Sequence, residues 1–450
     1  MSSSAYDVAV IGTGQGGVPL AIDLAAEGKR VIVFERDKLG GSCVNVGCTP
    51  SKAFLASAHA AGRARRAETL GIHAEVRVDF PAIMDRVRGI VHEWNTGVEE
   101  KFAGSTATLV RAEASFAGPR ELIADGATYE AQTIVIDTGT QPALPPIDGL
   151  DVVPYLTNLT MFDLTTLPTR TIVLGAGAIG LELGQGLALC GSSVHLVDSA
   201  ARVLATEDAD VSDTLERALV RDGITLHLGT HAVRVERDAG GVLLTLANGE
   251  RLAADALLVA AGRRPSVPQG ATDVGIALDP RGYIAVDAHL TTSVPHIYAL
   301  GDVAGQPQFT HVSWEDYRRL KATLGGDRSR TKNDRVLGYA VFTDPQVGRV
   351  GLTLASAQQA GRSARCVTLP LEHVARAVEF GETDGFFRMV VDEGTEEILG
   401  ATFVGYEAGE LVHIMLAHME AKSTWRTLER SVHIHPTYAE GLPSLARLLM

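Results

Sequence analysis

The stretch that decides the fold is residues 6–35, which reads YDVAVIGTGQGGVPLAIDLAAEGKRVIVFE. A short apolar run at residues 6–11 leads into a glycine-rich turn and then into a helical pattern over residues 18–27. A second apolar run, residues 30–34, ends on an acidic residue. Strand, glycine turn, helix, strand and acid in this order predict a dinucleotide-binding βαβ unit, and the full order is far more specific than a lone glycine motif.

This first unit also predicts which residues would contact a dinucleotide. Gly12 is expected to make the tight turn, Gly14 to let the backbone approach a pyrophosphate, and Gly17 to let the helix pack closely on the strand. The pyrophosphate would lie at the N-terminus of the helix, where free amide groups favour negative charge. Glu35, at the end of the second strand, is expected to accept a hydrogen bond from a ribose hydroxyl.

Residues 171–198 repeat the pattern. The glycines and the terminal acid of this second unit are Gly175, Gly177, Gly180 and Asp198. The spacing is also repeated, because Glu35 follows Gly12 by 23 residues and Asp198 follows Gly175 by 23 residues. The repeat predicts that one chain binds two dinucleotides.

A close pair of cysteines follows the first unit. Residues 40–52 read GGSCVNVGCTPSK and place Cys43 and Cys48 five residues apart, a spacing that fits neighbouring turns of one distorted helix. Such a pair can alternate between dithiol and disulfide when one thiol has a low pKa. A structural disulfide and half of a metal site are the alternatives. Redox use is favoured, because the expected compartment is reducing and no second close pair of cysteines exists to complete a metal site.

The other two cysteines have a different setting. Cys190 and Cys366 are isolated in apolar surroundings, and we expect both to be buried as small hydrophobic residues. Two dinucleotide sites with a single thiol pair between them therefore indicate an electron path that ends at Cys43 and Cys48.

Composition is that of an ordinary soluble protein. The 450 residues suggest about three domains, and an apolar fraction of 46% is enough for packed cores. The net charge is 40 − 54 = −14, which argues against a nucleic-acid partner. The short basic run Arg63, Arg65 and Arg66 is expected to be a solvated helix face. No apolar run approaches the ~18 residues of a membrane span and no secretory signal is visible, so we expect a cytoplasmic protein without membrane contact.

Residues 40–52 resemble the active-site helix of the group I pyridine nucleotide-disulfide oxidoreductases, which include dihydrolipoamide dehydrogenase, glutathione reductase and mercuric reductase. The resemblance covers nearly the whole chain. It implies an α/β fold with two Rossmann-like domains, one for FAD and one for NAD(P), and a C-terminal α+β dimerisation domain. The implied segments are residues 1–150 (FAD-binding, first part), 151–268 (NAD(P)-binding), 269–334 (FAD-binding and central part) and 335–450 (dimerisation).

The resemblance assigns roles around the thiols. Cys43 would be the interchange thiol that meets the substrate, and Cys48 the thiolate beside the flavin. Lys52 and Glu182 match an ion pair of the family near the reactive edge of the flavin. Further matches for the flavin are Thr138 and Gly139, in the short motif that crosses between the nucleotide domains, and Gly301 and Asp302, whose acid holds the ribityl chain. Gly262 lies in the motif that closes the nicotinamide domain.

Near the C-terminus, residues 433–440 resemble the HPTxxE motif of the same family. The resemblance implies that His435 and Glu440 form an acid–base dyad supplied by the other subunit of a homodimer. Histidine suits this task because its ordinary pKa of about 6.5 lets it accept and return a proton near neutral pH. A metal site at His433 and His435 is the weaker interpretation of these residues, and we predict no metal site.

The electron acceptor stays open. The dyad of His435 and Glu440 fits dihydrolipoamide dehydrogenase, whereas residues 310–317 look more like mercuric-reductase-like proteins. The chain ends without vicinal cysteines, has no N-terminal metal-binding domain and keeps His435 where mercuric reductases carry tyrosine, and soft-metal transfer needs thiolates in series. We expect a small disulfide substrate. A metal ion or small oxidant is the alternative, and a non-enzymatic flavin-binding sensor or structural subunit is a further one.

The second unit carries a preference between nicotinamides. Asp198 would accept from the adenosine 2′-hydroxyl of NADH and would repel the 2′-phosphate of NADPH. NADH is therefore expected to be preferred. Arg202 lies close enough in the sequence to leave NADPH possible.

Overall fold

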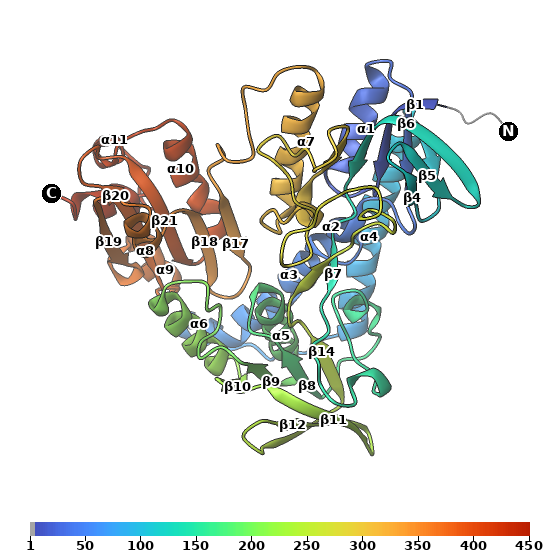
Figure 1. The fold of residues 1–450 in the computed structure, drawn as a ribbon. Helices are drawn as coiled ribbons and strands as arrows, with labels where there is room; N and C mark the ends of the chain where they lie inside the picture. Colours follow the sequence, from blue (N-terminus) through green and yellow to red (C-terminus); the bar gives the residue numbers. More distant parts are fainter. Residues whose placement is uncertain (1–4) are drawn as a thin grey trace.

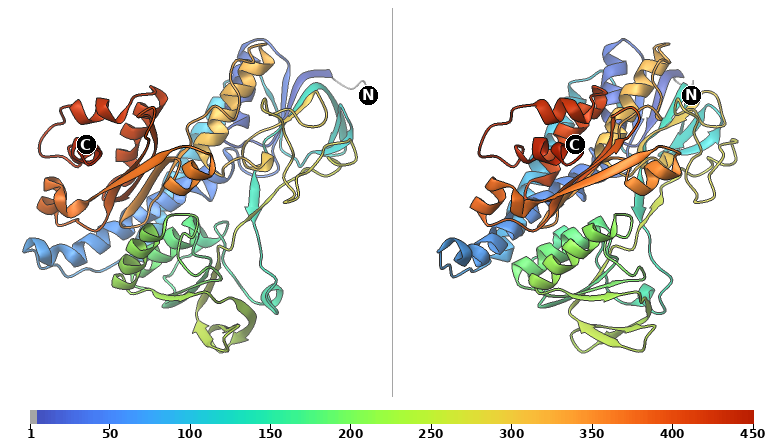
Figure 2. Two further views of the ribbon diagram at one scale, coloured as in Figure 1. Left: turned by 60° about the vertical axis from the view of Figure 1, so that its left-hand side comes forward. Right: turned by 90° about the vertical axis from the view of Figure 1, so that its left-hand side faces the viewer.

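The computed structural model describes residues 5–450, and residues 1–4, which begin the segment on which the signal expectation rests, lie outside the described residues. Figure 1 shows the first dinucleotide unit in blue, the second unit in green and the C-terminal region in orange to red as three lobes. In the left view of Figure 2 these lobes lie apart, and the long blue helices run between them. Both predicted βαβ units are present, in the predicted order of elements.

The first unit is built on a seven-stranded sheet. Its strands are β1 (Ala5–Ile11), β2 (Val31–Phe34), β3 (Thr108–Val110), β4 (Ser115–Gly118), β5 (Glu121–Ala124), β6 (Ala127–Ile136) and β16 (Ile297–Ala299). The order is β3-β2-β1-β6-β5-β4, with β16 also paired to β6. Because β1 is apolar and lies between two parallel neighbours, it is buried on both faces. Helix α1 (Gly17–Ala26) follows the first glycine turn.

The second unit has a smaller parallel sheet of order β10-β9-β8-β14. Its elements are β8 (Arg170–Leu174), α5 (Ala178–Cys190), β9 (Ser193–Asp198), α6 (Ala209–Arg221), β10 (Thr225–Leu228) and β14 (Ala256–Val259). A three-stranded antiparallel sheet covers one face through an apolar cluster and consists of β11 (Ala232–Asp238), β12 (Gly241–Leu246) and β13 (Arg251–Ala254). Strands β7 (Thr140–Pro142) and β15 (Arg263–Pro265) pair with each other where the chain crosses between the units.

The C-terminal region is an antiparallel sheet of order β17-β18-β21-β20-β19 with helices packed around it. The strands are β17 (Gly338–Val341), β18 (Gln346–Gly351), β19 (Ala364–Pro370), β20 (Phe386–Asp392) and β21 (Ile398–Gly405). The helices are α8 (Leu354–Gln359), α9 (Ala375–Phe380), α10 (Ala408–Glu420), α11 (Trp425–Arg430) and α12 (Gly441–Arg447). A linker without regular structure joins this region to α7 (Thr310–Leu324).

A pair of long helices connects the lobes. Helix α3 (Cys48–Arg66) packs on α5 and on α4 (Phe80–Ala103). The basic run at the end of α3 is a solvated face in part: Arg63 and Arg65 are exposed as expected, whereas the half-buried Arg66 bonds to Asp344 at 2.5 Å and lies 3.5 Å from Asp222. Arg65 donates to the carbonyl oxygen of Leu189. These arginines therefore join α3 to the second unit and to the C-terminal region.

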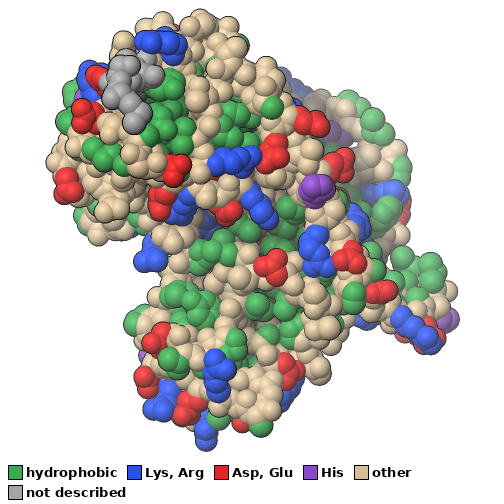
Figure 3. Space-filling model, turned by 90° about the vertical axis from the view of Figure 1, so that its right-hand side faces the viewer, with side chains coloured by type: hydrophobic (Ala, Val, Ile, Leu, Met, Phe, Trp, Pro, Cys, Tyr) green, Lys and Arg blue, Asp and Glu red, His purple; other side chains and the backbone are tan. Residues whose placement is uncertain are grey.

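The surface mixes both signs of charge. On the face drawn in Figure 3, acidic and basic side chains lie among one another without a continuous basic track. None of the helices within residues 5–450 is long and apolar enough to cross a membrane.

Candidate active site

The two predicted redox thiols lie on two consecutive helices rather than on one helix. Cys43 belongs to α2 (Gly41–Asn45), and Cys48 is the first residue of α3. The expectation of one distorted helix is wrong, because α2 ends at Asn45 and α3 begins at Cys48, after Gly47. A Cβ on Gly47 would lie 2.8 Å from the carbonyl oxygen of Ser42, so only glycine fits this tight break. The break leaves Cys48 at a helix N-terminus, which favours a thiolate.

The environment makes the two thiols unequal. The hydrogen bond from the Cys43 thiol lowers the pKa of Cys48 to about 6, and the Thr310 hydroxyl and the Lys52 charge act in the same direction. The same hydrogen bond, together with burial, raises the pKa of Cys43. The Thr310 Oγ1 atom lies 3.2 Å from the Cys48 Sγ atom and comes from the first residue of α7. These contacts therefore favour the thiolate at Cys48 over a thiolate at Cys43.

Lys52 and Glu182 meet beside the thiols, as the family resemblance implies. The Lys52 Nζ atom lies 2.7 Å from Glu182 Oε2, and Glu182 is buried on α5. The backbone N–H of Phe342 donates to the other Glu182 oxygen at 2.9 Å, and the Lys52 ammonium lies 4.7 Å from the centre of the Phe342 ring. This pair thus joins α3, the second unit and the C-terminal region.

The first glycine turn forms a cradle that side chains would fill. Gly12 has φ +99°, and a Cβ there would lie 2.4 Å from the Asp137 carbonyl oxygen. At Gly17 a Cβ would lie 2.5 Å from the Gly12 carbonyl oxygen. The Glu35 carboxylate accepts from the Thr13 amide at 3.0 Å and from the Thr13 hydroxyl at 2.5 Å.

Two further observations fit a dinucleotide at this turn. Gly139 has φ +62°, and the hydroxyl of Thr138 is buried and has no hydrogen-bond partner within the described chain. A buried hydroxyl of this kind is ready to bond to a bound ligand. The residues present therefore fit the FAD that the resemblance implies.

The predicted flavin acid Asp302 is already held in place. The Thr140 hydroxyl donates to Asp302 Oδ2 at 2.8 Å, and Arg263 donates to the same Thr140 oxygen at 2.7 Å. Burial raises the pKa of Asp302. The neighbouring Gly301 has φ +64°, and its N–H donates to the buried Asp316 at 3.0 Å.

The second glycine turn repeats the first one. Gly175 has φ +111°, and a Cβ there would lie 2.4 Å from the carbonyl oxygen of Ala260. The Asp198 carboxylate accepts from the Ala176 amide at 2.6 Å and from the Ala200 amide at 2.7 Å. Gly177 is the N-cap of α5, Gly180 packs directly on the Gly175 carbonyl group, and Gly262 has φ +120°.

His435 and Glu440 form the predicted pair, but away from the thiols of their own chain. The His435 Nδ1 atom lies 2.8 Å from Glu440 Oε2, and the His435 side chain is 72% exposed. The adjacent Val432 and Ile434 are 97% and 80% exposed. No hydrogen bond within residues 5–450 joins this dyad to Cys43 or Cys48. An exposed dyad flanked by bare apolar side chains is what a site shared between two subunits would show.

The remaining cysteines and histidines stay outside the site. Cys190 is buried as expected, whereas Cys366 is only half-buried on β19, so the expectation for Cys366 is wrong. The His433 Nδ1 atom lies 3.4 Å from the Ser431 hydroxyl. Among the described residues, no group of three or more His, Cys, Asp or Glu side chains is placed to hold a metal ion.

Sequence reasoning missed three residues of these sites. Asp137 and Asp316 are buried acids that accept hydrogen bonds from backbone amides of the first unit, those of Gly17 and Gly301 respectively, and Asp316 also accepts from Arg335. Thr310 reaches Cys48 across 262 residues of sequence. The only sequence signal for any of the three was the acid Asp137 itself, which directly follows the apolar residues 134–136.

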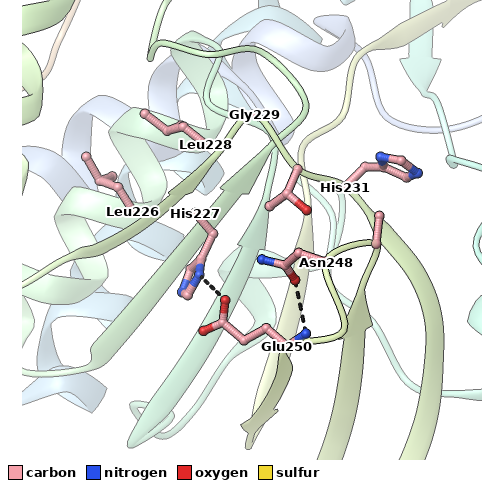
Figure 4. Close-up of a pocket in the computed structure, with 9 residues that line it drawn as sticks. Leu226, His227, Leu228, Gly229, His231, Asn248 and Glu250 are labelled. Carbon is pink, nitrogen blue, oxygen red and sulfur yellow. Dashed lines mark hydrogen bonds and ion pairs between the residues drawn. The ribbon is translucent and has the colours of Figure 1, made fainter.

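An open pocket of about 580 Å³ lies at the end of β10. Figure 4 shows His227 pointing toward Glu250, with Asn248 beside them. The His227 Nδ1 atom lies 3.2 Å from Glu250 Oε2, and its Nε2 atom lies 3.0 Å from His195 Nδ1. The backbone amide of Thr230, which lines the pocket, donates to the backbone carbonyl oxygen of Asp198, so this pocket borders the acidic residue of the second unit.

The sequence matches the pyridine nucleotide-disulphide oxidoreductase family over residues 6–316 and the dimerisation domain of that family over residues 338–446. The chain belongs to this family of FAD-dependent, pyridine-nucleotide-linked enzymes, which act on sulfur groups or metal ions.

Its similarity to individual members extends over nearly the full length. It is 35% identical to a dihydrolipoyl dehydrogenase from Thermus scotoductus, over 99% of this chain and 97% of the relative. It is 37% identical to a mercuric reductase from Streptomyces lividans, over 98% and 96%. Among solved structures, the HOCl-induced flavoprotein disulfide reductase RclA from Escherichia coli superimposes with a TM-score of 0.90 at 30% identity, over 99% of this chain and 100% of that chain.

Proposed function

We propose that this chain is an NADH-dependent reductase of small organic disulfides. The observation that carries the proposal is the unequal thiol pair: Cys48 begins a helix and its pKa is lowered to about 6, whereas the pKa of Cys43 is raised. FAD on the first unit would pass two electrons from the nicotinamide on the second unit to the Cys43–Cys48 disulfide. The other residues proposed to hold FAD are the glycines of the first turn with Glu35, Thr138, Gly139, Gly301 and Asp302.

The chemistry of the thiols then follows from their pKa values. Cys43 loses its proton to a base and attacks one sulfur of the substrate disulfide, so that a mixed disulfide forms and the other substrate sulfur leaves as a thiol after taking up a proton. The Cys48 thiolate then attacks the Cys43 sulfur, which releases the second substrate sulfur as a thiolate and leaves the Cys43–Cys48 disulfide. Each turnover consumes the two electrons that reduced this disulfide.

The base in this scheme is His435 from a second copy of the chain, oriented by Glu440. A proton acceptor is needed because burial and the bond to Cys48 raise the pKa of Cys43. The dimerisation domain at residues 338–446 supports a homodimer, and the exposure of His435 supports a site completed by the partner.

Local contacts favour NADH over NADPH. The Asp198 carboxylate is fixed at the second turn by two amides, where it would accept from a ribose 2′-hydroxyl. Arg202, which left NADPH possible, is bound to Asp213 and to the Ala209 carbonyl oxygen. Its charge is therefore offset within the chain rather than offered to a 2′-phosphate.

Reduction of a metal ion is a second candidate, favoured by one observation. RclA, which resembles this chain along its whole length, has been solved as a Cu(II) complex. Two thiols can reduce two Cu²⁺ ions to Cu⁺ while they form the Cys43–Cys48 disulfide. Mercuric ion is less well suited, because Cys190 and Cys366 lie on other elements and provide no further thiolate in series.

The test is a panel of NADH- and NADPH-driven reductions of lipoamide, glutathione disulfide, other small disulfides, cupric ion and mercuric ion. We expect one of the small disulfides to be turned over fastest, and we expect Cys43→Ser to abolish that turnover while it leaves FAD bound. Disulfide reduction that persists in Cys43→Ser would overturn the role of Cys43.

Histidine variants separate the two candidates. His435→Ala should remove disulfide reduction, because no group would take the Cys43 proton, but it should spare most of any cupric reduction. The matched control is His433→Ala, since His433 is the neighbouring histidine and its ring lies 3.4 Å from the Ser431 hydroxyl instead of pairing with Glu440. Equal loss in the two variants would contradict a proton-transfer role for His435.

A further inference from the structure

The most unusual buried group in the first unit is the carboxyl of Asp137. Asp137 directly follows β6, and only 6% of it is exposed. It lies under the glycine turn, because a Cβ added to Gly14 or Gly17 would come within 2.7 Å or 2.9 Å of its Oδ2 atom. The Gly17 amide, the first N–H of helix α1, donates to the same oxygen at 2.6 Å. Asp137 therefore contacts the helix end at which a dinucleotide pyrophosphate binds in this fold.

Within residues 5–450, the charged groups that face this carboxyl are acids. From η4 (Gly301–Ala304) Asp302 faces it, and from α7 Asp316 faces it. Both neighbours are acids with partners of their own, since Arg335 bonds to Asp316 and the Thr140 hydroxyl donates to Asp302. Glu35 on the β2 side bonds to Thr13.

The described groups that face Asp137 include no basic side chain. In the part of the chain that the structure describes, no Lys, Arg or His makes a hydrogen bond or ion pair with Asp137. Burial and the two acids raise the pKa of Asp137 well above its usual range, against the opposing effect of the Gly17 amide.

A bound pyrophosphate would add to this imbalance. It carries negative charge, and an ionised carboxylate buried next to it without a counter-ion would be strongly disfavoured. A protonated carboxyl avoids the repulsion and still accepts the Gly17 N–H with its carbonyl oxygen.

We propose that Asp137 is uncharged when the first unit holds its dinucleotide, and that binding of the diphosphate takes up one proton at Asp137 whenever the free chain has lost it. Asp137 is thus a positioning residue, which supports the first turn of α1 and makes flavin binding depend on pH. The inference rests on the assignment of FAD to the first unit but not on the electron acceptor.

The second unit provides an internal control. The residue in the position of Asp137 is Ala260, because Gly12 and Gly175 each place a Cβ 2.4 Å from the carbonyl oxygen of that residue. Beneath Gly177 a Cβ would meet nothing within 4 Å, so this unit holds no carboxyl under its turn. NADH binding there should take up no such proton.

The experiment measures FAD binding to the flavin-free full chain by quenching of flavin fluorescence, from about pH 5 to about pH 9. Affinity should be highest at low pH and should fall by about tenfold per pH unit above the pKa of Asp137 in the free chain, because only the protonated form binds well. Calorimetry in two buffers of different ionisation enthalpy should count about one proton taken up per FAD at the upper end of this range.

Two variants isolate the carboxyl. Asp137→Asn keeps a neutral acceptor for the Gly17 N–H, so its affinity should match the low-pH affinity of the parent at every pH. Asp137→Ala removes the acceptor, so its affinity should be lower and also independent of pH. Neither variant should change the pH profile of NADH binding, which is the control.

The proposal would be overturned by an Asp137→Asn protein that keeps the pH slope of the parent, or by a parent that binds FAD without proton uptake across the whole range. The proton count on the parent decides the matter even if a variant fails to fold. A chain that binds FAD with one proton but reduces no disulfide would overturn the proposed function alone.

Discussion

The two glycine turns share their backbone geometry but differ in what lies beneath them. A Cβ on Gly12 or Gly175 would lie at the same 2.4 Å from the carbonyl group that ends the neighbouring strand, β6 or β14. The side chain at that strand end is a carboxyl in the first unit and a methyl group in the second. The same turn can therefore be given a different charge by one residue that is far away in the sequence, while its own glycines stay unchanged.

The two units agree, by contrast, in the acid at the end of the second strand of each βαβ pattern, because the hydrogen bonds of this acid are the same in both units. Glu35 accepts from the amide of Thr13 and from the amide of Asp37, two residues beyond itself. Asp198 accepts from Ala176 and from Ala200, which occupy the same positions of the second unit. The repeated network explains why the 23-residue spacing recurs, because each acid must return to the residue after the first glycine.

The largest effect that tests this comparison is expected from matched glycine variants. At Gly180 a Cβ would lie 1.9 Å from the Gly175 carbonyl oxygen, and at Gly17 it would lie 2.5 Å from that of Gly12. Gly180→Val should lower the rate of flavin reduction by NADH at least about 100-fold with FAD retained, and Gly17→Val should lose FAD, because each valine separates its helix from its turn.

The measurements are flavin absorbance of the purified protein and stopped-flow reduction by NADH. Gly89→Ala is the control, since Gly89 lies in helix α4 outside both glycine turns and a Cβ there meets no atom within 4 Å. Loss of FAD in Gly180→Val would show that the two units do not act independently.

The next largest effect is expected at Asp198. Asp198→Ala removes the acceptor for a ribose hydroxyl, and a hydrogen bond to a charged group contributes about 1.5–3 kcal/mol. The KM for NADH should rise about tenfold or more, while the KM for NADPH should change little or fall. Steady-state kinetics with both nicotinamides measure this ratio. Equal increases for NADH and NADPH would contradict the preference proposed from Asp198.

A smaller effect on NADH affinity is expected when the residue at the strand end of the second unit is changed to the aspartate of the first unit. Ala260→Asp places a carboxyl under the second turn, where the open space beneath Gly177 can receive it. NADH affinity should then fall several-fold as the pH rises through the pKa of the new carboxyl, in the manner expected for FAD at Asp137. Binding of NADH measured by calorimetry against pH gives the profile. A variant with the flat profile of the parent would mean that the carboxyl alone does not create the pH dependence.

The local parts of both sites were predictable from the sequence, because each is encoded within a short segment. The turns, the acids Glu35 and Asp198, and the thiol pair lie within βαβ patterns or directly after one. The ion pair of Lys52 and Glu182 could be predicted only from the family resemblance, since 130 residues separate the two side chains in the sequence. Residues that act across larger gaps carried no such pattern: Asp137 bonds to Gly17 over 120 residues and Arg66 bonds to Asp344 over 278. The folding of the first unit creates the first of these contacts, and the packing of separate lobes creates the second.

The smallest effect is expected beside the thiols, which follow the first unit and have no counterpart in the second. The Thr310 hydroxyl lies 3.2 Å from the Cys48 sulfur and lowers the pKa of Cys48 less than the bond from Cys43 does. Thr310→Val keeps the shape of the side chain but removes this hydrogen bond, so the pKa of Cys48 should rise from about 6 by less than about one unit. Because the shifted pKa still lies near neutral pH, the thiolate fraction at pH 7 should fall by no more than about half.

Titration of the thiolate ultraviolet absorbance in the reduced protein measures the pKa of Cys48. Thr310→Ser, which keeps the hydroxyl, should leave this pKa near the parent value. An unchanged titration in Thr310→Val would mean that the helix N-terminus and Cys43 set the acidity of Cys48 without Thr310.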